Sequence, residues 1–117
     1  MAAPNIVNVA TITGKTAVQA VGTSATAIVT NSASSGKVFK VNALLVSNVD
    51  GTANAEITVD LYRSSTAYHL AKTVVVPADA TLDVLAKAIY LEEGDALRLT
   101  ANAASDLEAV CSYEEIS

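Results

Sequence analysis

Apolar and polar residues alternate strictly in one stretch near the middle of the chain. Residues 55–62 read Ala-Glu-Ile-Thr-Val-Asp-Leu-Tyr, so an apolar residue takes every second position up to Leu61. A period of two is that of a β-strand with one buried face and one face in water. The pattern therefore predicts a strand whose buried face carries Ala55, Ile57, Val59 and Leu61.

The preceding run, residues 38–49, has apolar residues on both of the faces that a strand would give it. One face holds Leu44 and Val46 among polar residues, and the other carries Phe39, Val41, Ala43 and Leu45. Two apolar faces are typical of a central strand that is covered on both sides. The connection to the next strand, residues 48–54, contains Asp50-Gly51, which predicts a hairpin loop with a residue at positive φ.

The second half of the chain repeats this alternation between regularly spaced turns. Strands are predicted over residues 69–76, 81–86, 89–91, 97–101 and 107–113, with turns or loops at 77–80, 92–95 and 102–106. Pro77 ends the first of these strands, because proline cannot donate to a ladder. Residues 79–87 compete as a short helix, but the shortness of the run and Val84 argue against it.

Turns about every 8 to 12 residues are the signature of a β-sandwich or a barrel. We therefore predict an all-β chain, a single antiparallel β-sandwich that is jelly-roll-like and has an extended N-terminal segment. Leu45 and Leu97 are predicted to lie in its core. Replacing either of them by alanine would then cost roughly 2–5 kcal/mol.

The first 35 residues differ from the rest, because they have strand propensity but almost no large side chains. We predict one domain overall, with residues 1–35 as small-residue strands or an arm and residues 36–117 as the core sandwich. Gly14 and Gly22 are expected to divide the segment into three short pieces, and residues 31–36 to form a flexible connection. Residues 16–30 favour edge strands of the same sandwich, whereas an arm on a neighbouring subunit stays open for residues 1–13.

The composition favours self-association and excludes nucleic-acid binding. Of the 117 residues, 51% are hydrophobic and only 16% are charged, so little repulsion opposes contact between copies. The net charge is −5, and the basic residues are scattered singly, whereas a nucleic-acid binder needs a basic stripe. Those basic residues are Lys15, Lys37, Lys40, Arg63, Lys72, Lys87 and Arg98.

The sequence also bears on where the chain is made. Its first eight residues have neither a basic region nor a long apolar run, so no signal peptide is predicted. No stretch approaches the roughly 20 apolar residues of a membrane span. We therefore expect synthesis in the cytoplasm and no membrane partner. One cysteine, Cys111, permits no intrachain disulfide.

Candidates for catalysis are few. His69 is the only histidine and Cys111 the only cysteine, so neither has a partner of its own kind for a zinc site. Cys111 shares an apolar face with Leu107 and Ala109, which favours a buried hydrophobe over a nucleophile. Gly14-Lys15-Thr16 matches only the end of a phosphate-binding loop, because position 9 is Val9 instead of glycine. We predict no catalytic residue, no cofactor and no metal, and hence no enzyme.

Carboxylates gather in three places. Glu92, Glu93 and Asp95 share one turn, and Asp50 and Asn54 share another. Such loops can supply oxygens to a hard cation, but neither has the dense spacing of a calcium loop, so solvated turn residues are the favoured interpretation. Near the C-terminus, Glu114 and Glu115 are predicted to form a solvated edge that discourages unwanted strand pairing.

Several short motifs between Gly36 and Ile116 carry a resemblance. They are Gly-Lys-Val-Phe-Lys-Val, Asn-Ala-Leu-Leu-Val-Ser-Asn, Ile-Thr-Val-Asp-Leu-Tyr, Val-Val-Val-Pro-Ala-Asp-Ala-Thr-Leu, Ile-Tyr-Leu-Glu-Glu-Gly-Asp-Ala-Leu-Arg-Leu-Thr-Ala and Ala-Val-Cys-Ser-Tyr-Glu-Glu-Ile. In this order the chain resembles the small β-sandwich virion proteins of tailed bacteriophages, particularly those of marine and cyanobacterial phages. The resemblance covers about two-thirds of the chain and assigns no catalytic residues.

The resemblance implies a structural part of a virion. A capsid decoration (cement) protein that packs in multiple copies is the first expectation. Its partners would be copies of itself and other virion proteins, the major capsid or tail proteins. The alternative is a tail, neck or fibre component with a receptor- or glycan-binding role. Sugar sites usually need exposed aromatic residues, and the chain offers Phe39, Tyr62, Tyr68, Tyr90 and Tyr113.

Overall fold

The computed structural model describes residues 4–117, which form nine β-strands and no helix. The described part therefore contains no helix able to cross a membrane. The strands are β1 (Ile12–Ala20), β2 (Thr26–Thr30), β3 (Val38–Asn48), β4 (Ala55–Arg63), β5 (Thr66–Val76), β6 (Thr81–Asp83), β7 (Ile89–Leu91), β8 (Ala96–Ala101) and β9 (Leu107–Ile116).

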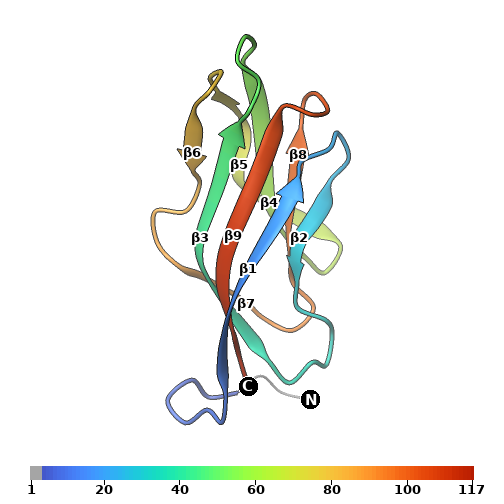
Figure 1. Cartoon of the computed structure of the whole chain (residues 1–117). Coiled ribbons are helices and arrows are strands. Elements are labelled where there is room, and N and C mark those ends of the chain that lie inside the picture. The colour runs from blue at the N-terminus through green and yellow to red at the C-terminus, as the bar shows by residue number, and fades with distance from the viewer. Residues whose placement is uncertain (1–3) are drawn as a thin grey trace.

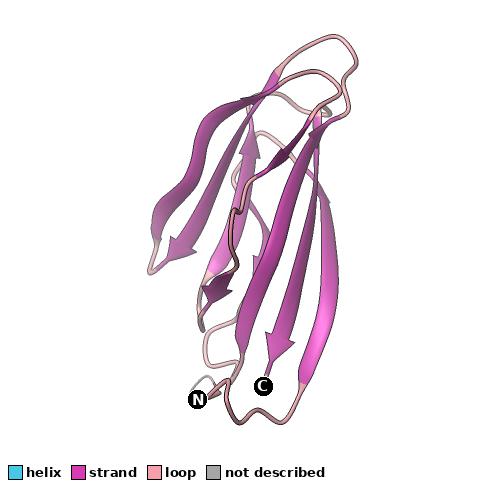
Figure 2. Ribbon diagram, turned by 90° about the vertical axis from the view of Figure 1, so that its left-hand side faces the viewer, coloured by secondary structure: helices cyan, strands magenta, loops and turns pink. Residues whose placement is uncertain are grey.

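The strands form two antiparallel sheets that pack face to face (Figures 1 and 2). One sheet, here the β9 sheet, has the order β1-β9-β3-β6, and β7 pairs with the other end of β3. The second sheet, here the β8 sheet, has the order β2-β8-β4-β5. The predicted single antiparallel β-sandwich is confirmed.

Successive strands usually belong to different sheets. Of the strands that follow one another in sequence, only β4 and β5 pair as a hairpin. The hairpin predicted at residues 48–54 is therefore wrong, because this loop passes from β3 in one sheet to β4 in the other. Gly51 does not adopt a positive φ either. The buried side chain of Asn48 organises the loop: its Nδ2 donates to the carbonyls of Ala53 and Val76, both at 2.9 Å, and its Oδ1 accepts from the Asp50 N–H.

A β-bulge explains why β3 has apolar residues at both odd and even positions. Val41 lies opposite Tyr113 and Ala43 opposite Ser112, so Asn42 is an extra residue without a partner on β9. Before the bulge, Phe39 and Val41 are buried, and after it Leu44 and Val46 are. β3 thus has one buried face, and the bulge moves the buried positions along the strand by one residue. The prediction that Ala43 and Leu45 share a face with Phe39 and Val41 is therefore wrong.

The core lies between the two sheets. Leu97 is 0% exposed, as predicted, whereas Leu45 is 39% exposed and points away from the core. The alternation predicted for β8 and β9 is confirmed, and that for β4 is confirmed as far as Val59, beyond which Asp60 is buried and Leu61 only half-buried. The largest fully buried apolar side chains are Leu44, Ile57, Leu91, Leu97, Leu99, Leu107, Val21, Val41, Val46, Val59 and Val76.

The N-terminal third contributes one edge strand to each sheet: β1 pairs with β9, and β2 pairs with β8. β1 runs unbroken through Gly14, so the predicted break at that glycine is wrong. Residues 4–11 lie beside the C-terminus, where the Ala10 and Thr11 N–H groups donate to the Ser117 carbonyl, both at 2.9 Å. The arm predicted for residues 1–13 includes residues 1–3, which lie outside the described residues. The predicted division of the domain into an N-terminal segment, residues 1–35, and a core sandwich, residues 36–117, stays a prediction.

Candidate assembly surface

His69 and Cys111, the two candidates for catalysis, have no catalytic partner among the contacts of residues 4–117. His69 is exposed on β5 opposite Asp60, but both oxygens of Asp60 bind Arg98, at 2.9 Å from Nε and 3.4 Å from Nη2. The guanidinium of Arg98 also lies 3.8 Å from the ring centre of Tyr62. Cys111 is fully buried, and burial raises the pKa of its thiol to about 11. A thiol with that pKa stays protonated at neutral pH and is a poor nucleophile.

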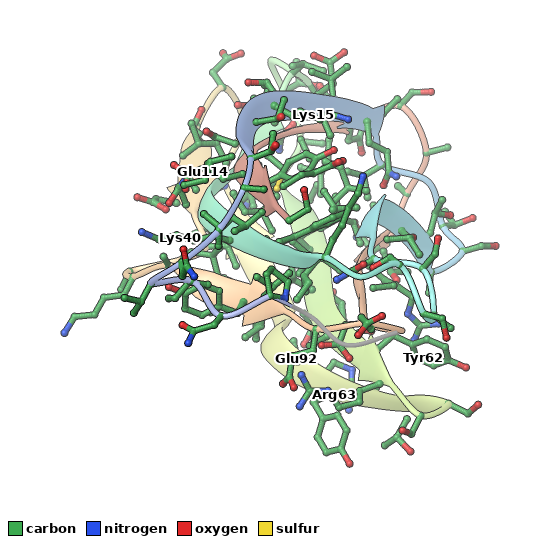
Figure 3. All side chains as sticks on the ribbon, turned by 90° about the horizontal axis from the view of Figure 1, so that it is seen from below. Lys15, Lys40, Tyr62, Arg63, Glu92 and Glu114 are labelled. Carbon is green, nitrogen blue, oxygen red and sulfur yellow. The ribbon has the colours of Figure 1, made fainter. Side chains whose placement is uncertain are left out.

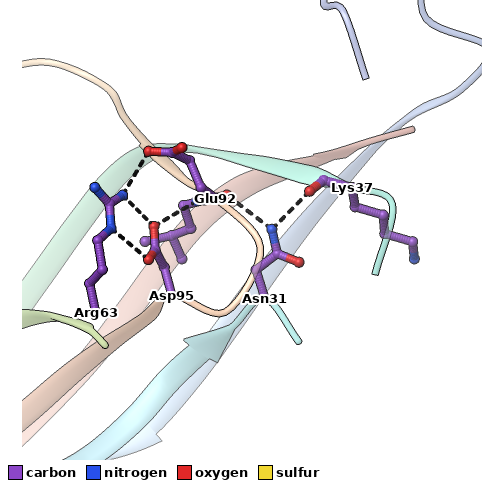
Figure 4. A network of polar contacts seen from close by, with 6 residues as sticks. Asn31, Lys37, Arg63, Glu92 and Asp95 are labelled. Carbon is purple, nitrogen blue, oxygen red and sulfur yellow. Dashed lines mark hydrogen bonds and ion pairs between the residues drawn. The ribbon is translucent and has the colours of Figure 1, made fainter. Parts of the chain in front are cut away.

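The turn carboxylates bind an arginine (Figure 4). Arg63 Nε donates to Asp95 Oδ1 at 2.8 Å, and Arg63 Nη2 donates to Asp95 Oδ2 at 2.6 Å and to Glu92 Oε2 at 2.8 Å. Burial raises the pKa of Asp95, but the hydrogen bonds from Arg63 and from the Glu92 N–H outweigh it and hold the pKa below its ordinary value. Glu93 accepts from the Gly36 N–H at 2.9 Å. The interpretation as a solvated turn residue is therefore wrong for Asp95, which is buried, whereas Glu92 stays exposed and Glu93 is half-buried.

The segment predicted to be a flexible connection is anchored by Asn31, which is completely buried. Asn31 Nδ2 donates to the carbonyls of Lys37 and Leu91, each at 3.0 Å (Figure 4). Its Oδ1 accepts from Ser35 Oγ at 2.6 Å. The side chain thereby ties the β2–β3 connection to the end of β7. Sequence reasoning missed Asn31 because a run of Ser, Ala and Gly follows it.

Glu115 does not lie on a solvated edge, because β9 is a central strand between β1 and β3. Its two oxygens bind Lys15 at 3.0 Å and Lys37 at 3.1 Å. Figure 3 views this end of the sandwich from below and shows Lys15, Lys40, Arg63, Glu92 and Glu114 around it. Glu92, Asp95 and Glu115 are used in ion pairs. Within residues 4–117, no group of three or more His, Cys, Asp or Glu side chains is placed to hold a metal ion.

The outer face of the β9 sheet carries a row of exposed aliphatic side chains. Val18 on β1, Val110 on β9 and Leu45 on β3 lie directly opposite one another in the strand registers. Their exposed fractions are 75%, 42% and 39%. Side chains so paired lie about 5 Å apart, so the three form a continuous apolar row, here called the valine row.

Most of the residues that border the valine row on its own three strands are small and uncharged, and Asp83 on β6 lies opposite Leu45. On one side lie Thr16, Ser112 and Ala43, which oppose one another on the same three strands. On the other side lie Ala20, Glu108 and Ser47, of which only Glu108 is charged. A hollow of about 320 Å³ opens between Val18–Ala20 and Glu108–Val110. Exposed apolar surface of this kind, with a polar margin, is typical of a protein–protein contact.

The edges of the sheets differ in how they are protected. β5 has irregular pairing with β4, β2 has irregular pairing with β8, and β6 and β7 are only three residues long. Bulges and short strands are common devices that prevent edge-to-edge pairing. β1 lacks them: its nine residues pair in unbroken register with β9.

The exposed aromatic residues do not form a common platform for a sugar. Tyr113 packs against Phe39 with ring centres 5.6 Å apart, and Tyr62 is covered by Arg98. Tyr68 and Tyr90 are exposed, but they lie on strands of different sheets. None of the described contacts favours the glycan-binding alternative.

No protein-family description matches the sequence, and no curated protein matches it. Solved structures do show the same fold. A chain from Bacillus endospore appendages, described as a novel family of disulfide-linked pili, aligns with a TM-score of 0.53 and 16% identity, over 92% of this chain and 88% of that chain. At this identity the likeness shows a shared fold alone.

A pentameric capsid protein isolated from metagenomic phage sequences also aligns, in two structures. The TM-scores are 0.44 and 0.43, the identities 21% and 20%, and each alignment covers 86% of this chain. This chain spans only 62% and 60% of the capsid chains. TM-scores at this level do not bear on function.

Proposed function

We propose that this chain is a structural protein of a virion that packs in multiple copies, with capsid decoration as its role. The observation that carries the proposal is the valine row: an exposed apolar row on the outer face of a sheet, where most of the adjoining residues are uncharged and Glu108 and Asp83 are the charged ones. Such a face suits a broad contact with another protein surface and does not suit a small substrate. The sequence resemblance to virion proteins of tailed phages supplies the setting, with copies of itself and capsid or tail proteins as partners.

The strand order supports the jelly-roll prediction as well. Jelly rolls have eight strands in two four-stranded sheets built from two Greek keys. The orders β1-β9-β3-β6 and β2-β8-β4-β5 have this form if β6 and β7 are taken as one interrupted strand along β3. A rigid sandwich that presents one sheet outward is suited to repeated packing.

Assembly of this chain would be non-covalent. The similar appendage protein is described as forming disulfide-linked pili. Cys111, the one cysteine here, is fully buried in the core and unavailable to a neighbouring chain. Contact between apolar faces is therefore the means of assembly that we propose.

Light scattering over a concentration series tests the self-association. We expect masses at multiples of 12.0 kDa for the unaltered protein. Val110→Lys places a charge in the centre of the valine row and should shift the protein to the monomer. Val75→Lys is the matched control, because Val75 is 49% exposed but lies on β5 in the other sheet. A protein that stays monomeric throughout, and is absent by mass spectrometry from particles of the virus that encodes it, would contradict the proposal.

A further inference from the structure

A turn at one end of the molecule displays two aliphatic side chains in water. Val7 is 90% exposed and Ile6 is 50% exposed. The turn is held in shape, because the Asn8 N–H donates to the Asn5 carbonyl and the Val7 N–H donates to Asn5 Oδ1, both at 3.0 Å. The hydrogen bonds of Ala10 and Thr11 to Ser117 fix it to the body of the sandwich. Holding aliphatic groups outward in a fixed turn prepares them for a partner at little entropic cost.

The hollow beside the valine row lies at the opposite end of β1. Figure 1 shows that β1, which starts at Ile12, runs from the end with the turn to the opposite end of the sandwich. Its last residues, Val18 to Ala20, line the hollow. Nine residues of extended strand span roughly 30 Å. The turn therefore cannot reach the hollow of its own chain, and only a second copy can bring the two together.

The two ends of the sandwich also differ in charge. The loops 49–54, 77–80 and 102–106, with the strand residues that adjoin them, carry six carboxylates and no lysine or arginine. These six are Asp50, Glu56, Asp79, Asp83, Asp106 and Glu108. Glu108 is an exposed residue of the hollow itself.

The end with the turn is balanced, because five basic residues accompany five acidic ones there. They are Lys15, Lys37, Lys40, Arg63 and Lys87 with Glu92, Glu93, Asp95, Glu114 and Glu115. Lys40 and Lys87 make no ion pair within the described residues. Two acidic ends would repel one another, whereas an acidic end can approach the balanced end of another copy and its unpaired lysines.

We infer that copies of this chain associate head to tail, with the Ile6–Val7 turn of one copy seated in the Val18–Val110 hollow of the next. This inference rests on the proposed function, and it names the partner of the assembly surface as a second copy and gives the contact a direction. A contact between different patches is heterologous and leads to a ring or to an open filament.

Cysteine cross-linking tests the direction of the contact, because Cys111 is buried and does not compete. Val7→Cys and Ala20→Cys are made in separate full-length chains. Under mild oxidation we expect cross-linked dimers when the two variants are mixed and few when either is oxidised alone. A chain that carries both changes should give a ladder of covalent oligomers. Dimers formed mainly by Val7→Cys alone would indicate a contact between like ends and would overturn the inference.

A second variant measures the apolar contribution. Val7→Asp would carry a charge into the hollow, so the apparent dissociation constant should rise by at least about tenfold. Val75→Asp, on the other sheet, should leave it unchanged. If oligomers form but neither the mixed cross-link nor the Val7→Asp effect appears, the head-to-tail contact is wrong and the proposed function stands. If light scattering shows only monomers, the head-to-tail contact is wrong, and the proposed function is wrong as well if the protein is also absent from virus particles.

Discussion

Leu44 and Leu45 are identical in chemistry and, as neighbours in a strand, lie on opposite faces of β3; the bulge at Asn42 sets the phase so that Leu44 is the one that faces the core. Replacing Leu44 by alanine removes the equivalent of about three methylene groups from a fully buried site. At about 0.8 kcal/mol each this is about 2.4 kcal/mol, to which the cavity left behind adds. We expect the free energy of unfolding to fall by roughly 2.5–4 kcal/mol.

Leu45→Ala should cost much less. Leu45 is 39% exposed on a flat outer face, so about 60% of the same transfer energy, roughly 1.5 kcal/mol, is the upper limit. No enclosed cavity forms, because water and neighbouring side chains can fill the space. Urea titration should be run at concentrations where light scattering shows the monomer, since Leu45 belongs to the proposed contact surface. The difference is read from the midpoint at a constant slope. Equal losses for the two variants, or a larger loss for Leu45→Ala, would refute the phase shift at Asn42.

Three further predictions concern other sites. Asp95 has a folded-state pKa below its unfolded value of about 3.9. The stability that its ionised form contributes is therefore present above that pH and is lost as the pH falls through the folded-state pKa. Urea titrations below pH 4 should show a smaller acid-induced loss of stability for Asp95→Asn than for the unaltered protein. Cys111 should resist a thiol reagent at pH 7.5 in the folded protein and react on unfolding, and rapid labelling of the folded chain would contradict its burial. Asn48→Ala removes the donor for the Ala53 and Val76 carbonyls. Thermal or urea unfolding should show a loss of stability of roughly 1–3 kcal/mol. A loss near zero would show that water replaces the amide group as the donor.

Much of the sandwich could be predicted from the sequence wherever a strand is regular. More buried and less buried residues alternate strictly over residues 55–59 of β4, 97–101 of β8 and 107–112 of β9. Leu97 and Cys111 are buried as the period of two requires. β3 could not be predicted in this way. One unpaired residue at a bulge shifts the phase, and two half-strands on one face then look like a single strand with two apolar faces.

The buried asparagines show a second limit. Asn31 and Asn48 stand next to loops and read as turn residues, yet each supplies the hydrogen bonds that a loop carbonyl needs once it is covered. Arg63 likewise reads as an isolated surface charge, because its partners Asp95 and Glu92 are about 30 residues away in sequence. Local pattern carries no signal for such long-range partners. The valine row could not be predicted for the same reason, because its three residues are recognised as neighbours only once the registers of β1, β9 and β3 are known.

The central place of β9 has a consequence for how the chain is made. β9 follows the other eight strands in sequence but lies between β1 and β3, so β1 has no hydrogen-bonding partner in its sheet until β9 has been synthesised. Only the β4–β5 hairpin can form from neighbouring segments, and the remaining pairings need distant ones, which favours slow folding. The valine row does not exist until β9 is in place. Copies therefore cannot recognise one another through the valine row before all nine strands have been made.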